Sequence, residues 1–135
     1  MSEFVDTNIS IRLISKDDPT KTARCLALVK RAEQGAAQLV TSEAIIAEVI
    51  YVLSSKALYG LGREEIASRV RPLIELRGLQ IDHKGSILFA LDLYEQSNLD
   101  FEDCLVLDHA DRLRVTGIYS YDRGFDRVNT LRLEP

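Results

Sequence analysis

The sequence has little of what marks a secreted, membrane or thiolate-metal protein. Of 135 residues only two are cysteines, Cys25 and Cys104, and neither forms a CxxC pair. Buried thiols in a reducing compartment are therefore favoured over a disulfide or a metal pair, which predicts a cytoplasmic protein. No apolar run reaches the ~18 residues of a membrane span, so no membrane association is expected. The start, MSEFVD, lacks the basic and apolar regions of a signal peptide.

The chain also has no low-complexity run, no internal repeat and no Pro/Gly/Ser-rich linker. With 46% apolar residues, a chain of this length buries roughly 70% of its unfolded surface. We therefore predict one domain spanning residues 1–135.

The net charge of −4 at first argues against a nucleic-acid partner. If four of the 21 acids neutralised bound metal, the remaining 17 (21 − 4) would balance the 17 lysines and arginines. Arginine outnumbers lysine 12 to 5, and its planar guanidinium group suits phosphate. A solvated surface with local salt bridges remains the alternative interpretation.

Short apolar runs alternate with helical patterns along the chain. Strands are expected at 2–6, 38–41, 79–82, 117–122 and 130–134, the first of them buried, with amphipathic helices between them. Thr41 or Ser42 is expected to cap the helix that follows the second strand. This alternation predicts an α/β domain with a largely parallel sheet. Ligands of such sheets bind beyond the carboxyl ends of the strands. Asp6 ends the first strand and Asp122 the fourth, so both are expected at one rim.

Glu48 lies among apolar neighbours in the third expected helix. Its neighbours at i±3 and i±4 are Ala44, Ile45, Tyr51 and Val52, which predicts a carboxylate on the buried face. Such a group is costly unless it is paired, hydrogen-bonded or bound to metal. A glutamate at the rim that reaches solvent or an arginine is the alternative.

Asp103 opens the apolar stripe of a later helix, ahead of Val106, Leu107 and Ala110. A capping box formed by Asp100 and Asp103 is the alternative interpretation.

Asp122 follows an apolar strand in SYDRGFD, where a turn aspartate before glycine is also common. Two unit charges 4 Å apart repel by about 1 kcal/mol in water and about 4 kcal/mol at an effective dielectric of 20. Four acids at one rim therefore favour a hard divalent cation, which accepts an all-oxygen site.

Four motifs in order, VDTN, AEVIYVL, DFEDCLVL and SYDRGFD, resemble the PIN-domain ribonucleases. Among these, the chain is most similar to the small VapC toxins of type II toxin–antitoxin pairs. The resemblance implies a three-layer α/β/α fold with a mostly parallel sheet of four or five short strands. It also implies a cognate VapB-like antitoxin and a homodimer.

The resemblance further implies an endoribonuclease that uses one or two Mg²⁺ or Mn²⁺ ions and leaves a 5′ phosphate and a 3′ hydroxyl. The family's metal-binding acids correspond to Asp6, Glu48, Asp103 and Asp122, and its accessory polar positions to Thr7, Asn8 and Ser120. Of the acids, Asp6 and Asp103 are expected to be direct ligands, whereas Glu48 and Asp122 act through water or hold a second ion.

One position departs from the family's pattern. Many relatives read D-R-D-F where this chain has D-R-G-F, so Gly124 replaces an acid. Asp126 is the candidate substitute. The missing acid affects the binding of a second metal ion and leaves the ligands of the first ion unchanged.

Neither histidine suits the role of general base. His109 is six positions after Asp103, about 240° around a helix, and His83 follows a strand far from the motifs. A metal ion would instead activate water and stabilise charge on the phosphate.

A phosphoryl-transfer protein on a flavodoxin-like sheet is one rival interpretation. Phosphoaspartate phosphatases need D-x-D after the first strand, where this chain has D-T-N, and receiver domains need an acidic pair before the end of that strand, which this chain lacks. A metal-free PIN-like scaffold that binds RNA or protein is the stronger rival.

Some of the surplus apolar residues are expected to line a groove for an antitoxin helix or strand; a homodimer interface is the alternative, and the two can occur together. The surplus residues are Ile11, Leu13, Ile14, Leu58, Tyr59 and Leu61.

Overall fold

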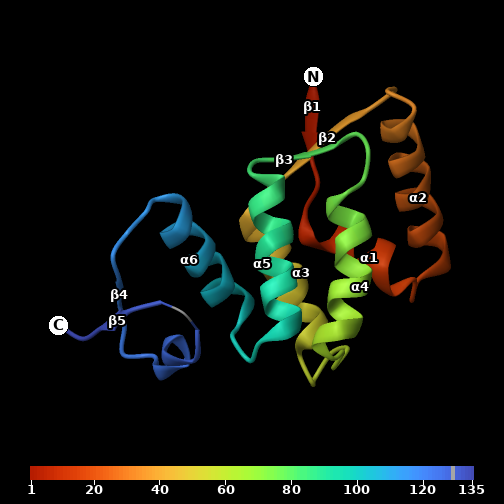
Figure 1. Ribbon diagram of the computed structural model, residues 1–135. Helices are drawn as coiled ribbons and strands as arrows, with labels where there is room; N and C mark the ends of the chain where they lie inside the picture. The colour runs from red at the N-terminus through yellow and green to blue at the C-terminus, as the bar shows by residue number, and fades with distance from the viewer. Residues whose placement is uncertain (129) are drawn as a thin grey trace. The chain divides into compact units, whose positions relative to one another are not determined.

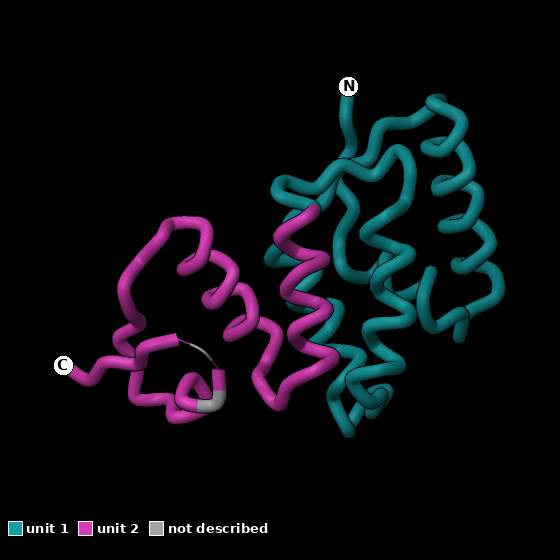
Figure 2. Tube along the Cα trace, in the orientation of Figure 1, with its two compact units in different colours: residues 1–84 teal, residues 85–135 magenta. Residues whose placement is uncertain are grey.

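The computed structural model describes residues 1–128 and 130–135, with the side chain of Arg127 left out of the description. The chain divides into two compact units, residues 1–84 and residues 85–135 (Figure 2). Each unit is described by itself. No helix among the described residues has the length and apolar character needed to cross a membrane.

The first unit contains three strands and four helices (Figure 1). The strands β1 (Ser2–Phe4), β2 (Gln38–Thr41) and β3 (Leu79–Ile81) form a parallel sheet in the order β1-β2-β3. The helices are α1 (Thr7–Ser15), α2 (Pro19–Glu33), α3 (Glu43–Ser54) and α4 (Arg63–Ile74). Helix α1 contacts the other three.

Local sequence explains where several of these elements begin. Asp18 caps α2 by accepting a hydrogen bond from Lys21 N, and Pro19 occupies the first turn, where its missing N–H has no helical partner. Ser42 caps α3 by accepting from Ile45 N, as the sequence predicts.

Gly78, just before β3, has a φ of 88°, and a Cβ atom there would lie 2.4 Å from the carbonyl oxygen of Ala32. Only glycine permits this approach of β3 to the end of α2.

The core of the first unit comes mainly from one face each of α3 and α4. On α3 the buried residues are Ile46, Val49, Ile50 and Leu53.

The prediction that the first strand is buried is wrong, because all three residues of β1 are exposed and Phe4 is 59% exposed. Among the described strands β1 pairs only with β2, so it lies at an edge of its sheet.

The second unit contains α5 (Lys84–Gln96, which starts at the last residue of the first unit), α6 (Phe101–Arg112) and the 3-10 helix η1 (Arg123–Arg127). Two short strands, β4 (Ile118–Tyr119) and β5 (Arg132–Leu133), pair in parallel. Helices α5 and α6 meet where the rings of Tyr94 and Phe101 pack edge to face at 6.2 Å.

The α/β class and the parallel pairing of strands are confirmed. The described strands are divided between a three-stranded and a two-stranded sheet, whereas the sequence analysis expected one sheet. The reason is that β5 supplies the backbone partners of β4, through Ile118 N to Leu131 O at 2.8 Å and Ser120 N to Leu133 O at 2.9 Å.

Candidate metal centre

Asp6 lies at the N-terminus of α1, two residues after β1. Its Oδ1 accepts a hydrogen bond from Thr7 N at 2.7 Å, and its side chain is exposed. The backbone before it is fixed to β2, because Val5 N donates to Val40 O and the buried hydroxyl of Thr41 donates to Val5 O at 2.9 Å. The end of β1 therefore holds Asp6 in place. The contribution of the Thr41 hydroxyl to the position of Asp6 was not predicted from the sequence.

Thr7 connects this helix terminus to α3. Its buried hydroxyl donates to Oε2 of Glu48 at 2.7 Å, across 41 positions of sequence. We call Asp6, Thr7 and Glu48 the Thr7 cluster. Asn8, the other accessory residue predicted here, is exposed.

The prediction that Glu48 lies on the buried face of its helix is wrong. Glu48 is exposed, as are its neighbours Ala44 and Tyr51, while the buried face is formed by other residues. Helix α3 is apolar on nearly every side, so apolar neighbours did not identify its buried face. The structure matches the alternative of a glutamate at the rim, with Thr7 rather than an arginine as its partner.

Asp103 is half-buried in the first turn of α6. Burial raises the pKa of its carboxyl group, and repulsion by Asp122 and Asp100 and a hydrogen bond with Asp122 raise it further. Asp100 occupies the N-cap position, but its side chain forms no capping hydrogen bond. The alternative of a capping box is therefore wrong.

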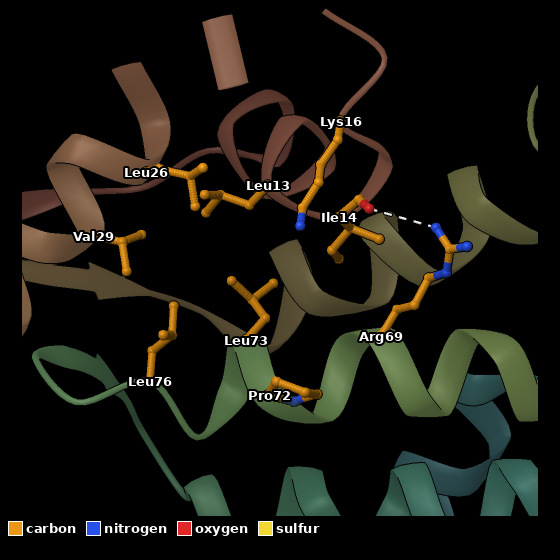
Figure 3. Close-up of a pocket in the computed structure, with 9 residues that line it drawn as sticks. All are labelled: Leu13, Ile14, Lys16, Leu26, Val29, Arg69, Pro72, Leu73 and Leu76. Atoms are coloured by element: carbon orange, nitrogen blue, oxygen red, sulfur yellow. Dashed lines mark hydrogen bonds between the residues drawn. The ribbon is translucent and has the colours of Figure 1, made fainter. Parts of the chain in front are cut away.

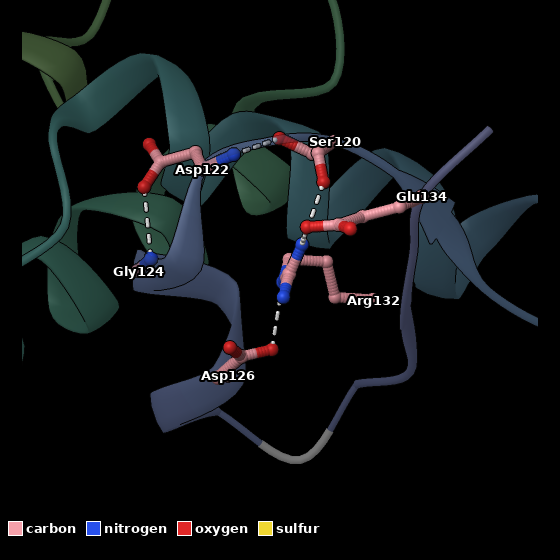
Figure 4. Close-up of polar contacts among 6 residues, drawn as sticks. All are labelled: Ser120, Asp122, Gly124, Asp126, Arg132 and Glu134. Atoms are coloured by element: carbon pink, nitrogen blue, oxygen red, sulfur yellow. Dashed lines mark hydrogen bonds and ion pairs between the residues drawn. The ribbon is translucent and has the colours of Figure 1, made fainter.

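Asp122 precedes η1 and is fixed on both sides (Figure 4). Its Oδ1 accepts from Gly124 N at 2.8 Å, and its own backbone N donates to Ser120 Oγ at 2.9 Å. The carbonyl oxygen of Ser120 in turn accepts from Arg132 at 3.0 Å. We call Asp103, Ser120 and Asp122 the Ser120 cluster. Ser120, predicted as an accessory residue, orients the backbone of Asp122.

Gly124 has a structural reason to lack a side chain. A Cβ atom there would lie 3.0 Å from Oδ1 of Asp122 and 3.1 Å from Cδ2 of Leu99. Asp126, the candidate substitute for an acid at this position, binds Arg132 Nε at 2.8 Å instead (Figure 4). That hydrogen bond lowers the pKa of the Asp126 carboxyl group.

Comparison with protein families assigns the chain as a whole. A family model of the PIN domain matches residues 4–131. The chain belongs to the PIN domain family. A search of curated proteins found no match to it. PIN domains are generally nucleases that act on RNA and use divalent metal ions, so a nuclease-type function follows from the family.

The carboxylates of this PIN domain fit a divalent cation by their chemistry. Each cluster supplies two carboxylates, and hard cations such as Mg²⁺ prefer oxygen ligands. Within residues 1–128 and 130–135, no group of three or more His, Cys, Asp or Glu side chains has the spacing of a metal site. The convergence of all four acids on one ion thus stays a prediction.

Asp108 is an acid of this PIN domain that the sequence analysis missed. It is buried on α6 and forms an ion pair with Arg112 Nε at 3.1 Å, one helical turn later. The D-x-x-x-R spacing was the available signal. The adjacent His109 contacts the same guanidinium group through Nδ1.

An apolar groove of about 290 Å³ lies among α1, α2 and α4 of the first unit (Figure 3). Of the six predicted groove residues, Leu13 and Ile14 line it. Ile11 is buried, and the three predicted residues that follow α3 do not line this groove. The other apolar residues of the lining are Leu26 and Val29 of α2, Pro72 and Leu73 of α4, and Leu76, which follows α4.

Proposed function

We propose that this PIN domain is a metal-dependent endoribonuclease and the toxin of a VapBC-type pair. The proposal rests on the observation that neighbouring hydroxyl groups form hydrogen bonds that position two of the predicted acids. Thr7 holds the carboxylate of Glu48, and Ser120 holds the backbone of Asp122. Such hydrogen bonds fix the positions of two of the four acids, as the ligands of a metal site require.

In this proposal Asp6 and Asp103 bind one Mg²⁺ or Mn²⁺ ion directly, while Glu48 and Asp122 bind through water or hold a second ion. A bound ion of this kind lowers the pKa of water and stabilises the charge on the phosphate. The chain's part is to orient the four carboxylates toward the ion. Burial and the neighbouring acids raise the pKa of Asp103, and a bound cation would lower it.

The test is RNA cleavage by the full chain in Mg²⁺ or Mn²⁺. We expect Asp6→Asn and Asp103→Asn each to abolish cleavage while the fold remains. Glu33→Gln, which removes an exposed acid at the end of α2, is the matched control and should cleave normally. Wild-type cleavage rates in either Asn variant would refute the assignment of the site.

A toxin of this class needs an inhibitor that covers it. We propose that a cognate VapB-like antitoxin places an amphipathic segment in the apolar groove and that the chain forms a homodimer. Co-expression with the adjacent small gene should relieve growth arrest and give a complex stable to gel filtration. Harmless overexpression of the chain alone, with no complex recovered, would refute the toxin role and leave the nuclease activity open.

The second candidate is a metal-free PIN-like module that binds RNA or protein. The replacement of an acid by Gly124 is the observation that favours it. RNA binding with no cleavage in any divalent cation would select this function.

A further inference from the structure

Exposed aromatic side chains lie close in sequence to the predicted metal ligands. The aromatic residues among those described that are largely exposed are Phe4, Tyr51, Phe89, Tyr119 and Tyr121. All but Phe89 lie within three residues, along the chain, of one of the four predicted ligand acids. Single exposed aromatic residues are common on protein surfaces, but several beside one candidate site indicate a bound molecule that the rings contact.

Tyr119 and Tyr121 are the most exposed of these side chains, at 71% and 75%. Tyr119 ends β4 opposite Leu133 of β5, and the pairing continues to Ser120, whose N donates to Leu133 O at 2.9 Å. Side chains alternate between the two faces of an extended chain, so the two tyrosines share one face and Ser120 lies on the other. The tyrosines are spaced by about 7 Å of backbone, so both can contact neighbouring bases of one nucleic-acid strand.

Neither tyrosine has a polar or aromatic partner among the described residues. Their hydroxyl groups form no hydrogen bond, and their rings pack against no other aromatic ring, within residues 1–128 and 130–135. In contrast, the hydroxyl of Tyr59 donates to Asp17 and the ring of Tyr94 packs against another ring. The rings of Tyr119 and Tyr121 are therefore available to a ligand.

The described arginine side chains near Asp122 differ in what they already bind. Arg132 binds Asp126 and Glu134 at 2.8 Å each (Figure 4). Arg123, next to Asp122, is exposed and forms no ion pair with a carboxylate in the described part of the chain. The hydrogen bond from Arg132 is the main cause of the lowered pKa of Asp126, and Arg123 contributes less. The guanidinium group of Arg123 is thus available to a phosphate.

We infer that Tyr119 and Tyr121 stack on unpaired bases beside the scissile phosphate and that Arg123 holds a neighbouring phosphate. Base faces are open to side chains only where RNA is unpaired, so the two tyrosines select unpaired RNA over duplexes. The inference rests on the proposed function in placing the scissile phosphate at the Ser120 cluster. Stacking itself requires neither a metal ion nor cleavage, so the two can fail separately.

A second copy of the chain is the alternative occupant of this face, because Leu131, just before β5, is also 60% exposed. The observations favour RNA. An interface between copies would not require exposed aromatic residues beside the ligand acids of both units, nor an unpaired arginine next to Asp122.

The test is the binding of labelled RNA by the full chain, measured by fluorescence anisotropy in Mg²⁺. Every protein compared carries Asp103→Asn, so that the RNA remains intact. The two probes are an RNA of about 12 nucleotides that cannot pair with itself, and the same strand annealed to its complement.

Tyr119→Ala and Tyr121→Ala should each weaken binding of the unpaired RNA about 5- to 150-fold, the range of base–aromatic stacking, and leave binding of the duplex unchanged. Tyr119→Phe and Tyr121→Phe keep the ring and should bind as the parent does. Arg123→Gln should weaken binding of both RNAs, because both carry phosphates. Phe89→Ala, which removes an exposed ring far in sequence from the ligand acids, is the matched control and should change neither.

Unpaired RNA that binds equally well to the Ala variants, or does not bind to the parent, would overturn the inference. Phe variants as weak as the Ala variants, or an equal loss of duplex binding, would show that the rings do not stack on bases. A change of oligomeric state in the Ala variants would assign the face to a second copy of the chain.

Melting curves that match the parent ensure that lost binding reports the rings and not the fold, and Tyr121 lies beyond β4, so its replacement leaves the strand pairing in place. Tyrosine-dependent binding without cleavage by the chain that keeps Asp103 would refute the nuclease activity alone. Cleavage of unpaired RNA that is unchanged in both Ala variants would refute the stacking alone.

Discussion

The hydroxyl group of Thr7 joins the start of α1 to the carboxylate of Glu48 through a hydrogen bond. We expect Thr7→Val, which keeps the shape and removes the donor, to lower the free energy of unfolding by about 1 kcal/mol, the net value of such a hydrogen bond. It should also slow cleavage, because Glu48 loses its orientation. Thr7→Ser keeps the donor and should restore both. Urea unfolding and cleavage assays check this, and equal behaviour of the Val and Ser variants would contradict it.

Asp103 gives a prediction with a defined pH dependence. Its folded-state pKa is raised by burial and by its acidic neighbours, so its ionisation destabilises the fold above that pKa. The penalty disappears as pH falls through the folded pKa toward the unfolded one. Without metal, Asp103→Asn should therefore melt higher than the wild type at neutral pH, and the difference should shrink as pH falls. A constant or reversed difference would show that Asp103 is not destabilising.

At the scale of elements, the corner between α1 and α2 offers a second pH test. Asp17 has its pKa lowered to about 2 from 3.8 by three hydrogen bonds. The resulting stability is complete above the unfolded pKa of 3.8 and is lost as pH falls toward 2. We expect Asp17→Asn to lower the melting temperature only slightly at neutral pH, because the interactions of Asp17 are exposed to solvent and such interactions contribute little to stability. The loss should vanish near pH 2, and a loss that persists there would contradict the account.

The sequence predicted elements well where local signals were strong. The alternation of strands and helices gave the α/β class, and Ser42 correctly marked the start of α3. It failed where signals were non-local. The buried face of α3 depends on what packs against it, since apolar residues surround the helix, and Glu48 was misplaced for that reason. The pairing of β4 with β5 depends on tertiary contacts that two-residue strands do not encode.

The candidate site was predictable as far as residue types carry its chemistry. The four acids and the accessory residues Thr7 and Ser120 were predicted from sequence motifs. In the structure, Thr7 is hydrogen-bonded to Glu48 and Ser120 to Asp122. Thr41 was missed because a buried hydroxyl leaves no periodic signal, and Asp108 was missed although its i,i+4 spacing to Arg112 was visible. From the sequence, Gly124 was interpreted as the loss of a metal-binding acid. The close contacts that a Cβ atom would make at this position give a structural reason for the glycine.

At the scale of the whole molecule, we propose that the two clusters bind the same metal ion. A ligand that binds only the folded state stabilises it by about 2.7 kcal/mol at a hundredfold excess over its Kd. If the clusters share an ion, losing one acid from either cluster should remove most of the stabilisation, and losing both should remove little more. If they act independently, the two losses should add.

The decisive measurement is the melting temperature of the full chain during titration with Mn²⁺, for the wild type, Asp6→Asn, Asp103→Asn and the double variant. We predict a clear rise for the wild type, little or no rise for either single variant, and the same small response for the double variant. An unchanged wild-type melting temperature would contradict the existence of a metal site. Single variants that each retain part of the rise, with losses that add in the double variant, would contradict a shared ion.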